Sequence, residues 1–317
     1  MKSAPSYNYQ ITDPVLIKIN KGQDIIQIYD NDLKYKKYNS IDSNRIESIN
    51  IDPNRIESIE KYEDHDTLEY RIKESEKDNY KTLDIAHMEL RDLSFLKLPT
   101  LQNLKYLFLS GNHLTDLEDL SFLKKLKVID LSHNNLPKLP YLPEDLEELS
   151  IKSNNINSLD RLTPLYNLKR LDCCNNSIKN IPPLMDSLEI LVCENNKLDY
   201  IPSLKKLNKL YCSNNQIKSI SIMPNLNVLE CNNNQITLLN DFISLKELYC
   251  QKNNIKLFKN LNKIEIIDCK FNPIEKIDYF YNLKTLICDD TSILLSKLYV
   301  ILESYTYQDN IRVFNFK

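Results

Sequence analysis

The sequence predicts a solenoid, in which short repeats stack in a row and each repeat buries its apolar face against its neighbours. Three columns of residues at fixed spacing indicate this fold. Seven of the eight cysteines recur every 19 or 20 residues, and nine asparagines recur in a column three positions further along the repeat. Leucine or isoleucine begins each unit, at steps of 22, 20, 22 and 20 residues and then 19 residues five times: Leu104, Leu126, Leu146, Leu168, Leu188, Leu207, Leu226, Leu245, Ile264 and Leu283.

Each repeat has the pattern L-x-x-L-x-[L/C]-x-x-N-x-[L/I], and an eleventh, earlier copy begins at Tyr80. Positions four and six are apolar and alternate with polar or variable residues, which is the period of a β-strand with one buried face. The sequence therefore predicts one strand per repeat, over about eleven repeats.

This pattern resembles the leucine-rich repeat family, most clearly in "LKYLFLSGNHL", "LKVIDLSHNNL" and "LYCSNNQI". The match covers roughly residues 80–293, and the short units with an inward cysteine are similar to bacterial and large-DNA-virus members of the family. The resemblance implies a horseshoe, with a parallel β-sheet on the concave face and short extended or 3₁₀ segments on the convex face. Only about eight residues follow the Asn-x-Leu step, so full convex helices do not fit.

The regular cysteines, from Cys173 to Cys288, occupy position six, where earlier repeats have Leu109, Leu131 and Ile151. Free cysteine behaves as a small buried hydrophobe, so packing is the favoured interpretation. A zinc site needs four ligands in a tetrahedron, whereas this column offers a line of thiols. Seven thiols in a row cannot all pair as disulfides, and parallel neighbours lack the required torsion. Metal binding and redox chemistry remain the alternatives to packing.

The asparagines at position nine are expected to be structural, because an amide can satisfy both a donor and an acceptor of the backbone where it leaves the sheet. Asn214, one position before the Asn215 of this column, is expected to be exposed and replaceable. The column ends at Met88 and Thr291, in the terminal repeats.

The flanking segments are predicted to be caps. Residues 1–79 contain a hairpin around Gly22, a duplicated decapeptide at 41–60, and a charged stretch at 60–78 that reads as a solvated helix or linker. The decapeptide is degenerate solenoid sequence or a short peptide-binding element. Residues 294–317 are a predicted C-terminal cap, with a helix over "SILLSKLYVILESY" from Ser292 and a strand over "NIRVFNF".

Composition disfavours several functions. The net charge of −3 provides no global basic field for nucleic acid. The two glycines, Gly22 and Gly111, cannot form a phosphate-binding loop, so no cofactor is expected. No secretory or membrane-spanning apolar run is seen, which predicts a cytoplasmic protein with reduced cysteines and no membrane partner.

The sequence offers no catalytic constellation, and a non-enzymatic protein is expected. No GxSxG or HExxH string occurs. His87 and His133 occupy the same repeat position two units apart, which places them about 10 Å apart and disfavours a shared metal. Some bacterial leucine-rich effectors are ubiquitin ligases with a separate catalytic cysteine, but every cysteine here is accounted for by the repeats.

Positions three and five of each repeat are expected to point out of the concave face. Of these twenty residues in the ten later repeats, ten are apolar or aromatic, six acidic and two basic. An exposed apolar row suggests a partner site, although Val and Ile also serve strand propensity. The predicted partner-binding residues are Tyr106, Phe108, Arg170, Asp172, Tyr211, Glu230, Tyr249 and Asp268.

The predicted function is an interaction module that binds a protein or peptide, basic and partly apolar, on its concave face. The alternative is a targeting or adaptor subunit of an enzyme complex whose catalytic component is a separate chain. Adhesion outside the cell, as in internalin-like proteins, would need an export signal.

Overall fold

The fold was analysed in a computed structural model of the 317-residue chain. The structure describes residues 16–21, 24–29, 36–39, 67–117, 119–182, 186–277, 280–289, 302–308 and 311–316. The chain divides into two compact units, residues 1–63 and 64–317. The duplicated decapeptide lies outside the described residues.

The N-terminal unit contains a small antiparallel sheet. Strand β1 (Leu16–Lys21) pairs with β2 (Asp24–Tyr29) at the place where the sequence predicts a hairpin around Gly22. A further strand, β3 (Lys36–Asn39), pairs antiparallel with β2. Its short polar sequence, "KKYN", gives no strand signal.

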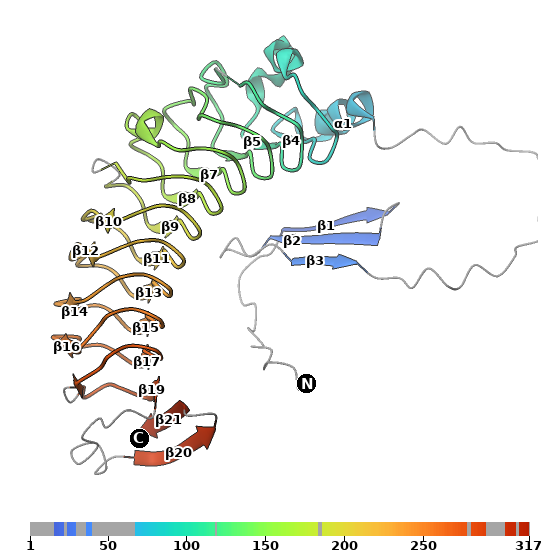
Figure 1. Ribbon diagram of the computed structural model, residues 1–317. Helices are drawn as coiled ribbons and strands as arrows, with labels where there is room; N and C mark the ends of the chain where they lie inside the picture. Colours follow the sequence, from blue (N-terminus) through green and yellow to red (C-terminus); the bar gives the residue numbers. More distant parts are fainter. Residues whose placement is uncertain are drawn as a thin grey trace, which may run out of the picture. The chain divides into compact units, whose positions relative to one another are not determined.

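The second unit is a curved solenoid whose concave side is a parallel β-sheet, as the repeat pattern predicts (Figure 1). Eleven parallel strands are described, from the copy that begins at Tyr80 to the copy that begins at Leu283; each covers positions three to five of its repeat, and the last continues to position seven. They are β4 (Thr82–Asp84), β5 (Tyr106–Phe108), β6 (Val128–Asp130), β7 (Glu148–Ser150), β8 (Arg170–Asp172), β9 (Ile190–Val192), β11 (Lys209–Tyr211), β13 (Val228–Glu230), β15 (Glu247–Tyr249), β17 (Ile266–Asp268) and β19 (Thr285–Asp289).

Consecutive strands pair in register, so that each repeat position forms a straight row along the sheet. Tyr211 pairs with Glu230, and Glu230 pairs with Tyr249. Because parallel strands lie about 4.8 Å apart, residues at one position of neighbouring repeats are in side-chain contact range. Residues that recur at the same repeat position in the sequence therefore form rows of neighbouring side chains on the sheet.

The convex side carries short extended and 3₁₀ segments, which confirms the prediction that full helices do not fit. Two small parallel sheets form there, β10–β12 and β14–β16–β18 (Figure 1). The segments are β10 (Tyr200–Ile201), β12 (Ser219–Ile220), β14 (Leu239–Asn240), β16 (Leu257–Lys259), β18 (Lys276–Ile277), η2 (Ser94–Lys97), η3 (Pro99–Asn103) and η4 (Asp160–Leu162).

One continuous apolar core runs between the two sides. The leucine columns at positions one and four are buried throughout the repeats, and the regular cysteines lie in the same core. All eight cysteine thiols are free and buried, Cys174 included. Packing at position six is thus confirmed, because the thiols replace the aliphatic side chains of Leu109, Leu131 and Ile151.

The asparagine column forms the ladder that the sequence predicts. Asn215 Nδ2 lies 3.0–3.2 Å from the carbonyl oxygens of Cys193, Cys212 and Ser213. Its Oδ1 accepts a hydrogen bond from the N–H of Leu198 at 3.0 Å. The same pattern recurs at Asn234 and Asn253, so each amide ties its own repeat to the preceding one.

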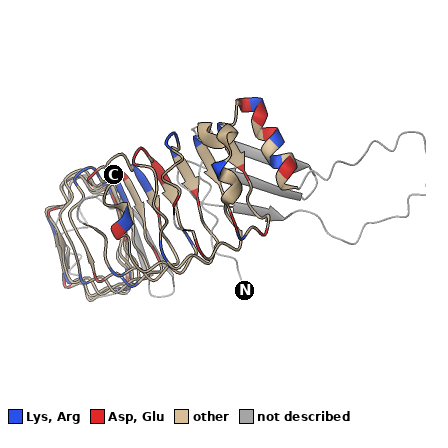
Figure 2. Cartoon of the chain, turned by 90° about the horizontal axis from the view of Figure 1, so that it is seen from above, with Lys and Arg blue, Asp and Glu red and all other residues tan. Residues whose placement is uncertain are grey.

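A helix covers the first repeat. Helix α1 (Leu68–Ser75) is capped by Thr67, whose Oγ1 accepts from the N–H of Tyr70 at 3.2 Å, and η1 (Glu76–Asp78) follows it. Both acidic and basic residues lie along the helix (Figure 2), but Leu68 and Ile72 pack against the core. The helix predicted in this charged stretch is present, and one side of it closes the end of the core.

The far end of the sheet is antiparallel. Strand β21 (Ile311–Phe316) pairs with β19, and β20 (Leu302–Gln308) pairs with β21. The strand predicted over 310–316 is present, with Phe314 buried. The helix predicted from Ser292 is wrong for Leu302 to Tyr305, which form a strand because their backbone pairs with β21. The rest of that helix lies outside the described residues.

Candidate partner-binding face

Positions three and five face the concave side, but the side chains there differ in exposure. Tyr106 is 41 % exposed, and Phe108, Tyr211, Glu230 and Tyr249 are half-buried. Three further predicted site residues are only 4–6 % exposed: Arg170, Asp172 and Asp268. The expectation that all of these side chains point to solvent is therefore wrong for those three, because neighbouring rows of a closely spaced sheet cover one another.

The aspartates at position five hold the backbone where the chain leaves the sheet. Asp172 Oδ1 accepts from the N–H of Cys174 at 3.0 Å, and Asp130 Oδ1 accepts from the N–H of Ser132 at 2.9 Å. Each carboxylate satisfies a backbone donor two residues on, at the point where the chain leaves the sheet. Asp268 makes the same bond to Lys270 at 3.4 Å.

In repeats seven to nine, which begin at Leu207, Leu226 and Leu245, other side chains bond to the backbone at position seven. The N–H of Asn232 donates to Ser213 Oγ at 3.0 Å, and the N–H of Gln251 donates to Asn232 Oδ1 at 2.8 Å. Gln251 Nε2 continues the chain to Asp268 Oδ2 at 2.8 Å. The sequence analysis missed this chain, although polar residues with acceptor side chains at position seven of successive repeats could have indicated it.

Position five of these repeats holds a row of Tyr211, Glu230 and Tyr249 on β11, β13 and β15. Since the three residues pair in register, the tyrosines stand about two strand spacings, or about 10 Å, apart with the carboxylate between them. Glu230 Oε1 accepts from Asn232 Nδ2 at 3.3 Å, and the Tyr249 hydroxyl donates to Glu247 Oε2 at 3.2 Å. These hydrogen bonds orient the row.

Burial raises the pKa of the Asp172 carboxyl above its ordinary range, because desolvation disfavours the charged form. A folded-state pKa above the unfolded value stabilises the fold fully at low pH, and that contribution is lost as the pH rises through the folded pKa. Asp172→Asn keeps an oxygen acceptor for Cys174 and removes the buried charge. We expect this variant to be more stable than wild type at pH 7, and to lose that advantage near pH 4.

The measurement is urea unfolding of both proteins at several pH values. The exposed Asp199→Asn variant changes the net charge equally and is expected to follow wild type. A variant that is less stable than wild type at pH 7 would show that the Asp172 charge stabilises the fold.

Burial keeps thiols of the cysteine row in their less reactive protonated form. Burial raises the pKa of Cys193, Cys212 and Cys250 well above the ordinary range, and the thiolate is the reactive form. Within the described residues, no three His, Cys, Asp or Glu side chains are placed to hold a metal ion together. In the same part of the chain, no helix is long and apolar enough to cross a membrane.

A histidine lies over Gly111. An added Cβ at this glycine would stand 2.1 Å from His87 Nδ1, and Gly111 has φ +70. The ring thus fills the space that a side chain at position eight of the next repeat would occupy. This explains one of the two glycines as a packing requirement, which the sequence analysis did not assign.

The margin of the sheet at position two carries lysines together with glutamates. Lys127 and Lys169 both pair with Glu147, at 3.3 and 2.8 Å. Lys284 pairs with Glu265 at 2.5 Å. A polar open hollow lies on the same margin, lined by Glu189, Lys206, Asn208, Asn225, Asn227, Ser244 and Lys263.

Comparisons with known proteins agree with this geometry. Residues 78–121, 102–144 and 205–244 match the family described as leucine-rich repeats in two copies, and residues 167–188 match a single leucine-rich repeat. No curated protein matches the chain.

Solved structures share the fold. The leucine-rich effector YopM from Yersinia pestis is 30% identical, with a TM-score of 0.56 over 65% of this chain and 58% of its own. TLR13 in complex with ssRNA13 is 21% identical, with a TM-score of 0.53 over 65% of this chain and 39% of its own. A chain in the complex of Latrophilin 3, Unc5D and FLRT2 is 22% identical, with a TM-score of 0.50 over 65% of this chain and 80% of its own.

Proposed function

Because the chain is a leucine-rich repeat protein, we propose that it is a non-enzymatic interaction module that binds a protein or peptide partner on its concave face. The observation that carries the proposal is the row of Tyr211, Glu230 and Tyr249. Two half-buried aromatic side chains flank one carboxylate at a spacing set by the sheet register.

This row suits a basic, partly apolar segment. Tyrosine offers a large and rigid contact area at low entropic cost, and the glutamate adds orientation by charge. Lys209 and Glu247, at position three of β11 and β15 on either side of β13, extend the mixed surface. Asp172 and Asp268 are too buried for direct contacts with a partner, and Asp268 pairs with Lys270 at 3.3 Å.

A polypeptide is the favoured partner over RNA. Among structures of this fold, one is a complex that contains FLRT2 with other proteins, and another is a complex of TLR13 with single-stranded RNA. The concave face of the present chain carries acids on strands β6, β8, β13 and β17 at position five. A phosphate backbone would be repelled there, whereas a basic peptide would be attracted.

The test is quantitative affinity capture from a reducing lysate, with the Tyr211→Ala, Tyr249→Ala double variant beside wild type. We expect the double variant to lose the captured partner by about tenfold or more, since both anchors are removed. Its thermal stability should stay close to wild type, because neither side chain lies in the apolar core. Glu230→Lys should weaken capture of the same partner, with an effect that depends on salt.

The matched control is the Tyr166→Ala, Tyr281→Ala double variant, which removes two exposed tyrosines that lie away from the concave strands. It should retain the partner. If the concave double variant also retains the partner, while changes within residues 1–79 release it, the concave-face proposal is overturned.

A further inference from the structure

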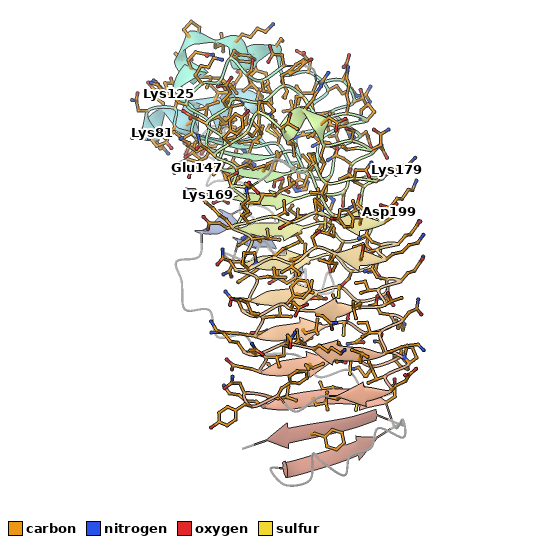
Figure 3. The ribbon with its side chains drawn as sticks, turned by 90° about the vertical axis from the view of Figure 1, so that its left-hand side faces the viewer. Lys81, Lys125, Glu147, Lys169, Lys179 and Asp199 are labelled. Carbon is orange, nitrogen blue, oxygen red and sulfur yellow. The ribbon has the colours of Figure 1, made fainter. Side chains whose placement is uncertain are left out.

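Five lysines gather on the margin of the sheet beside the first repeats: Lys81, Lys105, Lys124, Lys125 and Lys127, here called the lysine edge. Position two places Lys81, Lys105 and Lys127 on successive turns. The N–H of Lys105 donates to the Lys81 carbonyl at 2.7 Å, and the N–H of Lys127 donates to the Lys105 carbonyl at 2.8 Å. Lys124 and Lys125 precede Lys127 on the same margin, which Figure 3 shows for Lys81 and Lys125.

In other parts of this margin, lysine and glutamate alternate at position two, whereas the lysine edge has lysine in three successive repeats. Beyond Lys127, lysine and glutamate alternate as Lys127, Glu147 and Lys169, and again as Lys246, Glu265 and Lys284. Opposite charges on neighbouring turns form the ion pairs described above. Like charges at one strand spacing repel, so three lysines in succession are unfavourable without an anionic partner.

The lysine edge is accessible and largely unneutralised. Lys81, Lys105, Lys124 and Lys125 are exposed. Among the residues that the structure describes, neither Lys81 nor Lys105 has an ion pair, and Lys125 Nζ donates to the uncharged Asn103 Oδ1 at 2.7 Å. Lys127 pairs with Glu147 at 3.3 Å, and hydrogen bonds together with the charge of Lys124 lower the pKa of the Asp119 carboxyl.

We propose that the lysine edge is a second interaction surface, separate from the concave face, that binds an acidic polypeptide segment in an extended conformation. The position-two lysines span two strand spacings, about 10 Å. An extended chain presents every second side chain to one face, about 6.8 Å apart, so two or three acidic residues match the edge.

A nucleic acid fits this surface less well. The next repeat presents the exposed acids Glu144, Asp145 and Glu148; Lys127 Nζ donates to the Asp145 carbonyl at 3.2 Å, and Glu148 pairs with Val128, the residue after Lys127. A long polyanion that follows the margin would meet these acids, whereas a short acidic segment ends before them. The surface therefore selects for a short stretch of negative charge.

The probe is a fluorescein-labelled peptide in which four glutamates alternate with serines, with binding measured by fluorescence anisotropy at low and high salt. The test variant is the Lys81→Gln, Lys105→Gln, Lys125→Gln triple. The matched control is the Lys179→Gln, Lys218→Gln, Lys259→Gln triple, which removes three exposed lysines outside the lysine edge. Both variants change the net charge equally, and all six side chains are exposed.

We expect the edge triple to weaken peptide binding by about fivefold or more at low salt, and the control triple to change it by less than about twofold. The Tyr211→Ala, Tyr249→Ala variant should bind the probe as wild type does. Equal losses in both triples would show a non-specific charge effect and would overturn the proposal. Absence of binding, or tighter binding of a single-stranded oligonucleotide of equal charge, would overturn it as well.

Discussion

Phe258→Ala is expected to destabilise the protein by about 3–5 kcal/mol, the usual cost of removing a fully buried phenylalanine ring. Phe258 lies in β16 and is fully buried, and it is one of the two largest such side chains, with Phe242. Its neighbours in the convex sheet are Leu239 and Ile277. The ring fills the core between repeats that have few residues on their convex side, so the cavity cannot close without moving adjacent turns.

The measurement is urea unfolding combined with hydrogen exchange. A solenoid repeat contacts only its neighbours, so the loss of protection should concentrate in β13 to β19 and spare β4 to β7. Leu238→Ala, at an exposed position of the same convex side, is the control and should change stability by less than about 0.5 kcal/mol. An even loss of protection along the sheet would contradict the picture of locally coupled repeats.

The repeat architecture could be predicted from sequence because register in a one-sided strand is strongly constrained. A slip by one residue would turn Leu107, Leu210 and their equivalents out of the core, so the alternating pattern admits one register. The same argument located the strand that follows Tyr80, although that repeat lacks the asparagine. Pitch and alternation together determine which residues share a row.

Exposure within the concave face could not be predicted from the repeat pattern. Position five alternates sides with position four, so Asp172 and Asp268 share a face with Tyr211. Which of them is covered depends on side chains in the neighbouring repeats, and on whether a carboxylate bonds to a backbone N–H two residues on. The sequence assigned all of these residues to the partner site, whereas the structure gives the aspartates bonds within their own turns.

The C-terminal cap shows a second limit. Apolar spacing in "SILLSKLYVILESY" favours a helix, but Leu302 to Tyr305 pair with β21. A short apolar run is compatible with both the helical and the strand period, and here the pairing with β21 makes it a strand. The alternation in "NIRVFNF" was less ambiguous, and β21 forms there.

The conformation of position eight was also missed. This position has positive φ in successive repeats, at values of 53–58 for His133, Ser153, Asn175, Asn195, Asn214 and Asn233. Asparagine tolerates this left-handed region better than most residues, which explains its abundance there. Asn214 is exposed as expected, but its positive φ of 58 argues against free replacement. Leucine at 214 should cost about 1 kcal/mol through backbone strain.

Asn215→Leu is expected to destabilise the protein by about 1–3 kcal/mol or more, through a different cause. Its amide bonds to three carbonyl oxygens and one N–H, of which the groups of Cys193, Cys212 and Leu198 belong to core-facing residues. Leucine removes all of these bonds and leaves buried backbone groups unsatisfied, and each such group costs about 1–3 kcal/mol. Urea unfolding of the single variants is the measurement.

Substitutions at three adjacent residues distinguish backbone strain from the loss of the amide hydrogen bonds. Gln216→Leu changes an exposed side chain whose residue does not have positive φ, and it should alter stability by less than about 0.5 kcal/mol. The expected order of loss is Asn215→Leu, then Asn214→Leu, then Gln216→Leu. Backbone strain alone would make Asn214→Leu the most damaging, and simple loss of polarity would make the three equal. Asn215→Leu should cause the largest loss of stability if the amide hydrogen bonds between repeats stabilise the fold. Among these three residues, Asn215 is the one whose side-chain Nδ2 and Oδ1 both bond to the backbone of the preceding repeat.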